Sequence, residues 1–234
     1  MKLEDLHALS VSVVRLGRGV VALAPAREPQ KPLELFEFEV CPYCRKVRET
    51  LSELDLDYVS RSGARGSSSR QEAVLRGGKA QFPYLVDPNT GAQMYESEDI
   101  VDYLHATYGK GPRASWRRLL SPLDTASSAL ASGVRLRPRT VLAGLEGRAQ
   151  PAARLELWSF EGSPYCRKVR EELNVLGLDT LVHNVAKRGR RRPALVALGG
   201  KMQVPYLVDP NTGVAMYESD DIIAYLRRTY GPPP

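Results

Sequence analysis

The chain is poor in cysteine and histidine and has no long hydrophobic run, and each shortage excludes a class of protein. Of 234 residues only three are cysteine, too few for the disulfide framework of a small secreted domain. No run of about 18 uncharged apolar residues occurs, so we expect no membrane-spanning helix. Only three histidines are present, and the cysteines have no further soft ligands at zinc-site spacing, so we expect no metal. Hydrophobic residues make up 43% and charged residues 26%, as in an ordinary globular chain.

The N-terminus lacks the features of a secretory signal. Glu4 and Asp5 stand where such a signal is positively charged, and Arg15 and Arg18 interrupt the apolar stretch that follows. We therefore expect a cytoplasmic protein in a reducing compartment, with import into an organelle by a transit peptide as the alternative.

What the chain does contain is a tandem repeat. Residues 33–109 (copy one) and 155–231 (copy two) align without a gap at a constant offset of 122, and 44 of the 77 aligned residues are identical. Both copies contain the strings PYCRKVRE, PYLVDPNTG and MYES. A unit this long predicts two domains of one fold rather than a solenoid. The expected organisation is a leader at 1–32, domain one at 33–109, a linker at 110–154 and domain two at 155–231.

Each copy predicts the element order β-α-β-α-β-β-α. A short apolar and aromatic run is followed by a proline-initiated segment in which Val47, Leu51 and Leu54 recur with helical spacing. The Asp-Pro-Asn-Thr-Gly string is a turn between two strands, because proline fixes φ while Asn and Gly tolerate positive φ. Ser97 is expected to cap the last helix and Gly109 to end it. In copy one the strands are expected at 34–38, 57–60, 84–86 and 93–95, and the middle helix at 71–75.

The excess of positive charge lies in the linker. The chain carries a net charge of +6, and residues 110–154 contain nine basic residues against two acidic ones. An acidic partner could dock on such a segment. The densest basic run, 187–192, has no interleaved aromatic residues, so we expect a solvated loop there rather than a nucleic-acid site. Short helices are expected in the leader and near 115–120 and 126–130, and each such helix could pack on the copy that follows it.

The strongest chemical signal is the motif Cys41-Pro42-Tyr43-Cys44, which stands where the first strand gives way to a helix. Unpaired backbone N–H groups and the helix dipole stabilise a thiolate at a helix N-terminus. Cys41 is therefore predicted to be an exposed, low-pKa nucleophile, and Cys44, one turn later, to be the buried resolving thiol. An inert buried pair is the structural alternative.

With CPYC after the first strand, a proline before the third strand and a Glu-Ser pair opening the last helix, the chain resembles the glutaredoxins and the N-terminal domain of glutathione transferases. More closely, it resembles bacterial and plastid proteins with two such domains in tandem. The resemblance covers both copies and implies an α/β protein of two tandem thioredoxin-like domains, each with a mixed four-stranded sheet.

The same resemblance implies glutathione as cosubstrate and supplies a set of binding residues. Pro83 is expected to be a cis proline beside the cysteinyl group of glutathione. Glu96 and Ser97 are expected to hold the γ-glutamyl group at the helix N-terminus, although simple helix capping would also explain them. The site would be completed by Tyr43, Lys79, Gln81 and Phe82, of which Lys79 and Gln81 could reach the glycyl carboxylate.

Copy two lacks the nucleophile. Its motif is Ser163-Pro164-Tyr165-Cys166, so dithiol exchange is impossible there. It is either a structural or glutathione-binding domain, or a transferase-like site in which the Ser163 hydroxyl activates the glutathione thiol. The candidate residues of this second site are Ser163, Cys166, Val204, Pro205, Glu218 and Ser219.

Three functions are open at this stage. The leading hypothesis is a glutathione-dependent thiol–disulfide oxidoreductase that acts on protein or small-molecule disulfides through Cys41. The second is a glutathione transferase using Cys41 or Ser163, although the linker is too short for the helical domain that such transferases append. The third is a non-catalytic module that binds glutathione or a protein.

Overall fold

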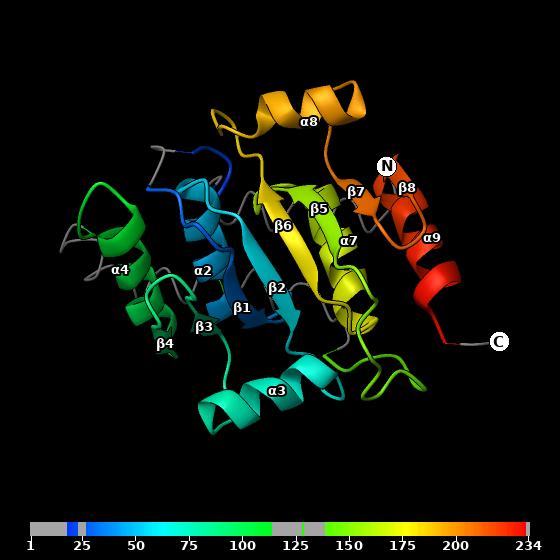
Figure 1. Ribbon diagram of the computed structural model, residues 1–234, viewed down its shortest axis with the longest axis horizontal. Coiled ribbons are helices and arrows are strands. Elements are labelled where there is room, and N and C mark those ends of the chain that lie inside the picture. Colours follow the sequence, from blue (N-terminus) through cyan, green and yellow to red (C-terminus); the bar gives the residue numbers. More distant parts are fainter. Residues whose placement is uncertain (1–17, 23–26, 114–127, 129–138, 233–234) are drawn as a thin grey trace.

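The computed structural model describes residues 18–22, 27–113, 128 and 139–232, and in it both copies fold with the predicted element order (Figure 1). The middle helix of copy one is longer than expected, at 68–77 instead of 71–75. Copy one consists of β1 (Leu33–Glu37), α2 (Pro42–Glu53), β2 (Tyr58–Ser62), α3 (Ser68–Gly77), β3 (Tyr84–Val86), β4 (Gln93–Met94) and α4 (Ser97–Tyr108). Copy two consists of β5 (Leu155–Ser159), α7 (Pro164–Val175), β6 (Thr180–Asn184), α8 (Arg192–Gly199), β7 (Tyr206–Asp209), β8 (Val214–Tyr217) and α9 (Ser219–Tyr230).

The strands of each copy form the predicted mixed sheet. In copy one, β1 is parallel to β2 and antiparallel to β3, and β3 is antiparallel to β4. Copy two repeats this pairing with β5, β6, β7 and β8. Both copies therefore have the thioredoxin-like arrangement that the resemblance implies.

The two sheets are joined edge to edge into one. β2 pairs antiparallel with β6, with Val59 opposite Leu181 at the centre of the register. The result is a single sheet of eight strands in the order β4-β3-β1-β2-β6-β5-β7-β8, with the seam at its centre (Figure 1). Because β2 and β6 are equivalent strands of the repeat, an approximate two-fold axis passes through this seam.

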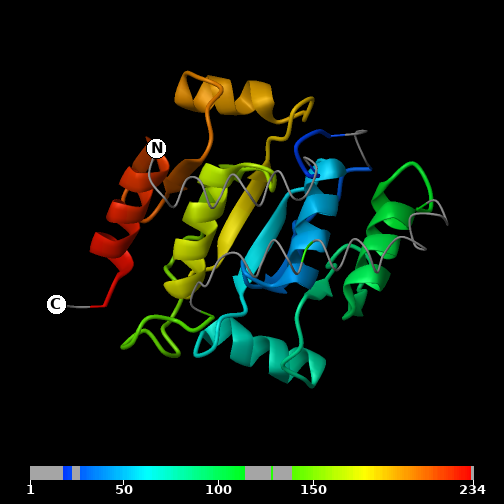
Figure 2. The same cartoon turned by 180° about the vertical axis from the view of Figure 1, so that it is seen from behind.

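Successive residues of β1 face two different hydrophobic cores. Leu35 packs in a cluster with residues of α2 and α4, and this cluster also contains Val182 of copy two. Phe36 points the other way and packs with Ala73 of α3. Copy two repeats the pattern, so α2, α4, α7 and α9 cover one face of the sheet (Figure 2) while α3 and α8 lie against the other. None of the helices described is long and apolar enough to cross a membrane.

The segments that precede the two copies cross the seam. The backbone N–H of Arg65, in copy one, donates to the carbonyl of linker residue Arg139 over 2.8 Å. The backbone N–H of Lys187, the equivalent residue of copy two, donates to the carbonyl of leader residue Val20 over 2.8 Å. The described parts of both segments thus bond to the copy that they do not directly precede. The helices expected in the leader and near 115–120 and 126–130 lie outside the described residues, apart from Ser128.

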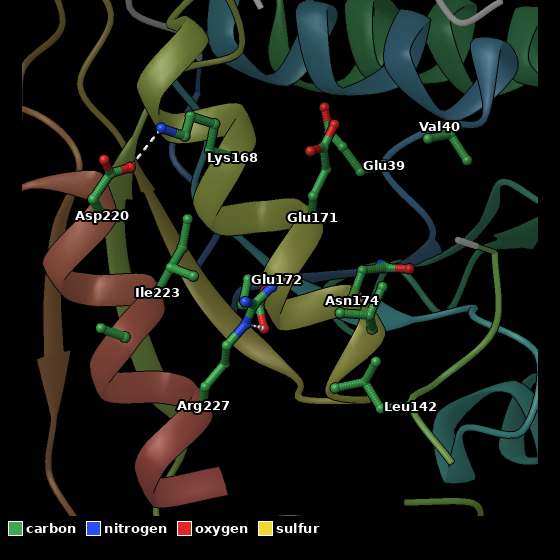
Figure 3. A pocket seen from close by; sticks show the side chains of 12 residues that line it. Glu39, Val40, Leu142, Lys168, Glu171, Glu172, Asn174, Asp220, Ile223 and Arg227 are labelled. Atoms are coloured by element: carbon green, nitrogen blue, oxygen red, sulfur yellow. Dashed lines mark hydrogen bonds and ion pairs between the residues drawn. The ribbon is translucent and has the colours of Figure 1, made fainter. Parts of the chain in front are cut away.

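The linker also closes one side of a cavity between α7 and α9 (Figure 3). This cavity has a volume of about 440 Å³, and its apolar lining includes Leu142, Val175 and Ile223. Charged side chains border it, among them the pair formed by Lys168 and Asp220, whose Nζ and Oδ1 lie 2.5 Å apart. No cysteine lines the cavity, so it is separate from the thiol chemistry.

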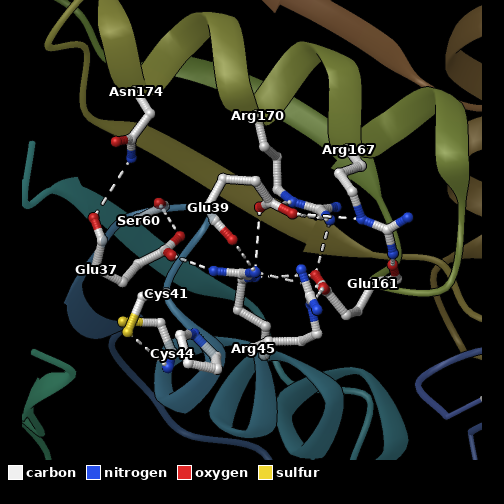
Figure 4. A network of polar contacts seen from close by, with 12 residues as sticks. Glu37, Glu39, Cys41, Cys44, Arg45, Ser60, Glu161, Arg167, Arg170 and Asn174 are labelled. Carbon is white, nitrogen blue, oxygen red and sulfur yellow. Dashed lines mark hydrogen bonds and ion pairs between the residues drawn. The ribbon is translucent and has the colours of Figure 1, made fainter. Parts of the chain in front are cut away.

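Under the seam, α2 and α7 face each other through buried charges (Figure 4). Arg48 of α2 reaches Glu161 of copy two, with Nε 2.9 Å from Oε2, and Arg170 of α7 reaches Glu39 of copy one over the same distance. The two pairs are equivalent under the offset of 122, and all four residues are at most 6% exposed. Each arginine also contacts the glutamate of its own copy, at 3.2 Å for Arg48 and 2.7 Å for Arg170.

One member of this charged group has no counterpart. Glu37 contacts Arg48, whereas the equivalent residue of copy two is Ser159, whose hydroxyl accepts a hydrogen bond from Arg170 over 3.1 Å. Burial raises the pKa of Glu37 even though Arg48 opposes the shift. Burial would raise the pKa of Glu39 as well, but the charges of Arg170 and Arg48 outweigh it and hold that pKa at about 2.

Removing one partner of the buried group should destabilise the protein strongly. Arg170→Met leaves Glu39 and Glu161 short of a buried cation, and breaking a buried ion pair costs about 3–5 kcal/mol. The control is Arg227→Met, because Arg227 pairs with Glu172 at the surface with 61% of its side chain exposed, where a pair contributes about 0–1 kcal/mol. Denaturant unfolding of both variants measures the difference, and an equal, small loss would contradict a structural role for the network.

A further polar cluster joins the copies beside the seam. In β6, His183 Nδ1 lies 2.6 Å from Asp57 Oδ2 of copy one, and Nε2 lies 3.2 Å from Glu156 Oε2. The imidazole stacks on Trp158 with ring centroids 4.4 Å apart. Burial lowers the pKa of His183, but its hydrogen bonds and attraction to Asp57 and Glu156 outweigh burial and raise the pKa above its usual 6.5.

This shift predicts a pH-dependent contribution of His183 to stability. Because the folded-state pKa exceeds the unfolded value, the contribution is fully present below pH 6.5 and is lost as the pH rises through the folded-state pKa. The difference in unfolding free energy between wild type and His183→Gln should therefore be largest at acid pH and shrink on going to alkaline pH. Unfolding curves of both proteins over this range test the sign, and a difference that grows with pH would refute it.

Candidate functional site

Cys41 occupies the N-cap of α2, directly after β1 and its connecting turn. Its backbone is extended, with φ −73° and ψ 119°, and its Sγ accepts a hydrogen bond from the Cys44 N–H over 3.3 Å. Pro42 takes the first helical position, where an N–H would have no partner inside the helix. The Cys41 thiol also donates to the carbonyl of Phe82 over 3.9 Å, and the Phe82-Pro83 peptide bond is cis. The cysteine motif and the expected cis proline therefore lie side by side.

The surroundings of Cys41 favour its thiolate. The largest cause is the hydrogen bond that the Cys44 side chain gives to it, which burial opposes. The backbone N–H groups of Cys44 and Tyr43 and the charge of Arg48 act in the same direction as that hydrogen bond. Together they lower the pKa of Cys41 below its ordinary 9.0, as expected for a thiol at a helix N-terminus. The residue is only 4% exposed, so it is less accessible than the sequence suggested.

Cys44 has the opposite environment. It is fully buried, and burial is the main reason that its pKa lies well above 9.0. Its hydrogen bond to Cys41, the Cys41 charge and the carboxylate of Glu37 raise the pKa further. Both residues are free thiols in this structure. Cys41 therefore ionises more readily than an ordinary cysteine and Cys44 less readily, which is the division of roles that a nucleophile and a resolving thiol require.

Cys41 borders a pocket of about 350 Å³, a size typical of small-molecule sites. Four of the residues predicted from the sequence meet there, namely Cys41, Tyr43, Gln81 and Phe82. The Tyr43 side chain is half exposed, at 49%. The full lining consists of Phe38, Cys41, Pro42, Tyr43, Arg65, Arg70, Ala80, Gln81, Phe82 and Arg139.

Glu96 and Ser97 do not act as a helix cap. The N-cap position of α4 is occupied by Glu96, whose side chain makes no capping hydrogen bond, and Ser97 is already the first helical residue. The expectation that Ser97 caps this helix is therefore wrong. Glu96 has φ 64°, a strained value for a residue with a side chain, and strain of this kind gathers at binding sites. Its Oε1 accepts a hydrogen bond of 2.5 Å from Gln81, which connects it to the Cys41 pocket.

Lys79 stands apart from this group. Its Nζ lies 4.4 Å from the centroid of the Tyr95 ring, a cation–π contact, and it is absent from the lining of the Cys41 pocket. Of the two residues predicted to reach a glycyl carboxylate, only Gln81 therefore borders the pocket.

Copy two repeats the geometry without the nucleophile. Ser163 is the N-cap of α7, and its Oγ accepts from the Cys166 N–H over 3.3 Å. The Val204-Pro205 bond is cis, and Glu218 has φ 70° and accepts from Gln203 over 2.5 Å. Ser219 opens α9 as Ser97 opens α4. The second-site candidates therefore occupy the positions that their counterparts occupy in copy one.

Three arginines in the Cys41 pocket were not anticipated. Arg65 and Arg70 lie in the segment that matches the basic run 187–192, for which we expected a solvated loop, and Arg139 belongs to the basic linker. The excess positive charge of the linker indicated an anion-binding role for this segment. No pattern of neighbouring residues, however, predicts that the linker bonds to copy one. Among the residues that the structure describes, no cluster of three His, Cys, Asp or Glu side chains could hold a metal ion.

Comparison with known proteins finds one family model that matches both copies. The family model described as glutathione S-transferase, N-terminal domain, matches twice, over residues 35–113 and 157–234. No curated protein matches. Among solved structures, a trimeric glutathione transferase from Leishmania, TDR1, is similar at 15% sequence identity, with 86% of this chain and 67% of that chain covered and a TM-score of 0.34.

The contacts of Cys41 predict how its reactivity depends on Cys44. Cys44→Ser retains a side-chain hydrogen-bond donor and Cys44→Ala removes it, so the Ala variant should have the higher Cys41 pKa. The pH dependence of iodoacetamide alkylation, with mass spectrometry to identify the modified residue, measures both. If the alkylation midpoints of the two variants are equal and lie near the ordinary cysteine pKa of 9.0, the two thiols are an inert pair.

Proposed function

Because the chain belongs to the family of glutathione S-transferase N-terminal domains, we propose that it is a glutathione-dependent thiol–disulfide oxidoreductase with Cys41 as its nucleophile. The observation that carries this proposal is the pair of opposed thiols, Cys41 with a lowered pKa and Cys44 buried with a raised one. A transferase would need only one activating group, whereas a second thiol one turn along the helix serves disulfide exchange.

In the first step the Cys41 thiolate attacks the sulfur of a glutathione mixed disulfide. A bond forms between Cys41 and the glutathione sulfur, the original disulfide breaks, and the other half leaves as a thiolate that takes a proton from water. A second glutathione then attacks the Cys41 mixed disulfide, which releases oxidised glutathione and restores the Cys41 thiolate. Glutathione is thus the reductant: one free glutathione thiol is oxidised as it joins the glutathione half of the substrate, and the sulfur of the other half is reduced to a thiol.

Protein disulfides follow the route through Cys44. The Cys41 thiolate attacks the protein disulfide and forms a mixed disulfide, and one protein sulfur leaves as a thiolate that takes a proton from water. Cys44 then loses its proton to water and attacks the Cys41 sulfur, and the second protein sulfur leaves as a thiolate that is protonated in turn. The product is an intramolecular disulfide and a reduced protein, and two glutathione thiols later reduce the enzyme and leave as oxidised glutathione. Because the pKa of Cys44 is raised, this second step is expected to be the slower one.

The pocket and the N-terminus of α4 beside it offer groups for the cysteinyl and γ-glutamyl parts of glutathione. The backbone around the cis bond of Phe82 and Pro83 would lie along the cysteinyl residue, since Phe82 borders both Cys41 and the pocket. Glu96 would pair with the γ-glutamyl ammonium, and the N-terminus of α4 at Ser97 would receive its carboxylate. The strained backbone of Glu96 and its bond to Gln81 support this assignment.

Two substitutions separate the proposed roles. Cys41→Ser should abolish reduction of the mixed disulfide between glutathione and 2-mercaptoethanol, whereas Cys44→Ser should retain it, because a second glutathione replaces Cys44. A coupled glutathione reductase assay measures the turnover. Cys166→Ser is the matched control, since it removes the equivalent buried thiol in the copy without a nucleophile. Full activity of Cys41→Ser would refute the proposal.

The alternative is a transferase that uses Ser163. The observation in its favour is that Ser163 has the helix position of Cys41, with the cis Pro205 and the strained Glu218 in place. Conjugation of an aromatic electrophile that survives Cys41→Ser but is lost in Ser163→Ala would establish it. If neither activity occurs and glutathione does not raise the melting temperature, the chain is a module that does not bind glutathione.

A further inference from the structure

Three arginines border the Cys41 pocket, of which Arg70 is half-buried while Arg65 and Arg139 are exposed. Arg48, Arg61, Arg170 and Arg191 each lie within ion-pair distance of at least one acidic side chain. Within the described residues, no acidic group pairs with the side chains of Arg65, Arg70 and Arg139, although all three border one pocket of about 350 Å³. Three uncompensated positive charges around one cavity favour a negatively charged ligand.

Two of these arginines are held in place by the fold. The guanidinium of Arg70 lies 4.8 Å from the centroid of the Phe82 ring and donates to the Gly63 carbonyl over 2.7 Å. The backbone around Arg139 is held by two hydrogen bonds to Arg65. The Arg139 carbonyl accepts from the Arg65 N–H over 2.8 Å, and the nearby Val141 N–H donates to the Arg65 carbonyl over 2.9 Å. Burial and the charge of Arg65 lower the pKa of Arg70, which indicates that like charges lie close together. The fold therefore fixes the guanidinium of Arg70 and places the backbones of Arg65 and Arg139 beside it.

This arrangement occurs only in the copy that has the nucleophile. In copy two Lys187 stands in place of Arg65, and Arg192 in place of Arg70 with the equivalent bond to the Val185 carbonyl, at 3.1 Å. The leader, however, brings Val20 to the place where the linker brings Arg139. Among the described residues, the cation that the linker supplies at Arg139 therefore has no equivalent at Val20, on the side of the copy that also lacks the reactive cysteine.

The charge also exceeds what glutathione needs. One guanidinium can bind a carboxylate through two parallel hydrogen bonds. Of the two carboxylates of glutathione, one is assigned above to the N-terminus of α4, which leaves a single glycyl carboxylate for the pocket. Three arginines therefore have capacity for an additional anionic group, and in a glutathione mixed disulfide the other half is the part that can supply one.

We infer that Arg65, Arg70 and Arg139 form an anion subsite that selects, as the leaving half of a glutathione mixed disulfide, a small thiol bearing a multiply charged anionic group. The inference rests on the proposed function for its substrate, but the subsite itself does not depend on turnover. The pocket volume of about 350 Å³ is in the range of small-molecule sites, so we choose a small thiol as its occupant. The anionic group is either a phosphate or a pair of carboxylates, since guanidinium recognises both. The exchange step is the one described above, and the arginines take no part in its proton or electron transfers.

The first experiment tests the subsite without turnover. Cys41 is alkylated with iodoacetate, an anion, and with iodoacetamide, its neutral analogue; in both reactions the thiolate displaces iodide and forms a carbon–sulfur bond. Both reagents react with the same thiolate, so the ratio of the iodoacetate rate to the iodoacetamide rate does not depend on the fraction of Cys41 that is ionised. A change in this ratio between variants therefore measures a change in the attraction of the anionic reagent. We expect this ratio to fall roughly three- to tenfold in Arg139→Gln and in Arg65→Gln, and to fall in wild type at 1 M salt, where the Debye length is only about 3 Å.

The matched control is Lys187→Gln. It removes one positive charge at the position equivalent to Arg65 but in copy two, and it should leave the Cys41 ratio unchanged. An equal fall in Lys187→Gln and Arg139→Gln would mean that net charge alone attracts the reagent, and would overturn the subsite. A ratio that is the same in wild type and in the arginine variants would overturn it as well.

The second experiment identifies the anion. Mixed disulfides of glutathione with phosphopantetheine, with pantetheine and with mercaptosuccinate provide a phosphate, a matched uncharged thiol and a dicarboxylate. We expect kcat/KM to be roughly tenfold higher for at least one anionic substrate than for the pantetheine substrate, and this advantage to disappear in Arg139→Gln. Preference for the first substrate identifies a phosphate, and preference for the third identifies carboxylates.

The outcomes separate the two proposals. If all three disulfides are reduced equally well, or if Arg139→Gln raises the KM for glutathione alike with every substrate, the anion subsite is refuted and the oxidoreductase stands. If no disulfide is reduced but the alkylation ratio still depends on Arg139, the subsite stands and the proposed function fails.

Discussion

Two reciprocal ion pairs, Arg48 with Glu161 and Arg170 with Glu39, hold the two halves of this protein together. Charges in so dry a place cost several kcal/mol each in lost hydration unless partners compensate them. In this protein each copy supplies one arginine and one glutamate. The two-fold relation between the copies places the arginine of each copy beside the glutamate of the other, so that every charge has a partner. A lone copy would lack the partner glutamate and would expose β2 as an open sheet edge. The docking of α2 on α7 is therefore part of the fold itself.

The common scaffold makes the differences between the copies informative. The strained Glu96 and Glu218 and the two cis prolines are duplicated. Three of the differences lie at or near Cys41: the cysteine itself and Glu37 are both serine in copy two, and leader residue Val20 takes the place of linker residue Arg139. A shared backbone geometry thus supports two sites, while the groups that set charge and reactivity are present in one.

The sequence correctly predicted the features that depend on residues close together in the chain. The element order, the mixed sheet of each copy and the position of the CPYC motif at a helix N-terminus all follow from local patterns, and the structure has them. The repeat shows that the halves share a fold but carries no information on how they dock. The seam and the crossing segments depend on contacts between residues more than 70 positions apart, as in the bond from Arg65 to Arg139. The string PYCRKVRE, which is identical in both copies, also indicated the interface, although our sequence analysis did not use it. Only one copy has the nucleophile, so the nucleophile alone does not explain why the string is identical in both. Arg48 and Arg170 of the interface belong to this string.

Arg48 belongs to both the seam and the thiol site, and this links the two. It pairs with Glu161 across the seam and lowers the pKa of Cys41. Because an electrostatic interaction is mutual, the Cys41 thiolate must in turn stabilise the buried charge of Arg48. In the proposed reaction, a disulfide between Cys41 and Cys44 would remove the thiolate and leave Arg48 to the three glutamates alone. The proposed function therefore implies that the charge balance of the interface between the copies changes with the redox state of the cysteine pair. Glu37 contributes to both groups, because it contacts Arg48 and raises the pKa of Cys44.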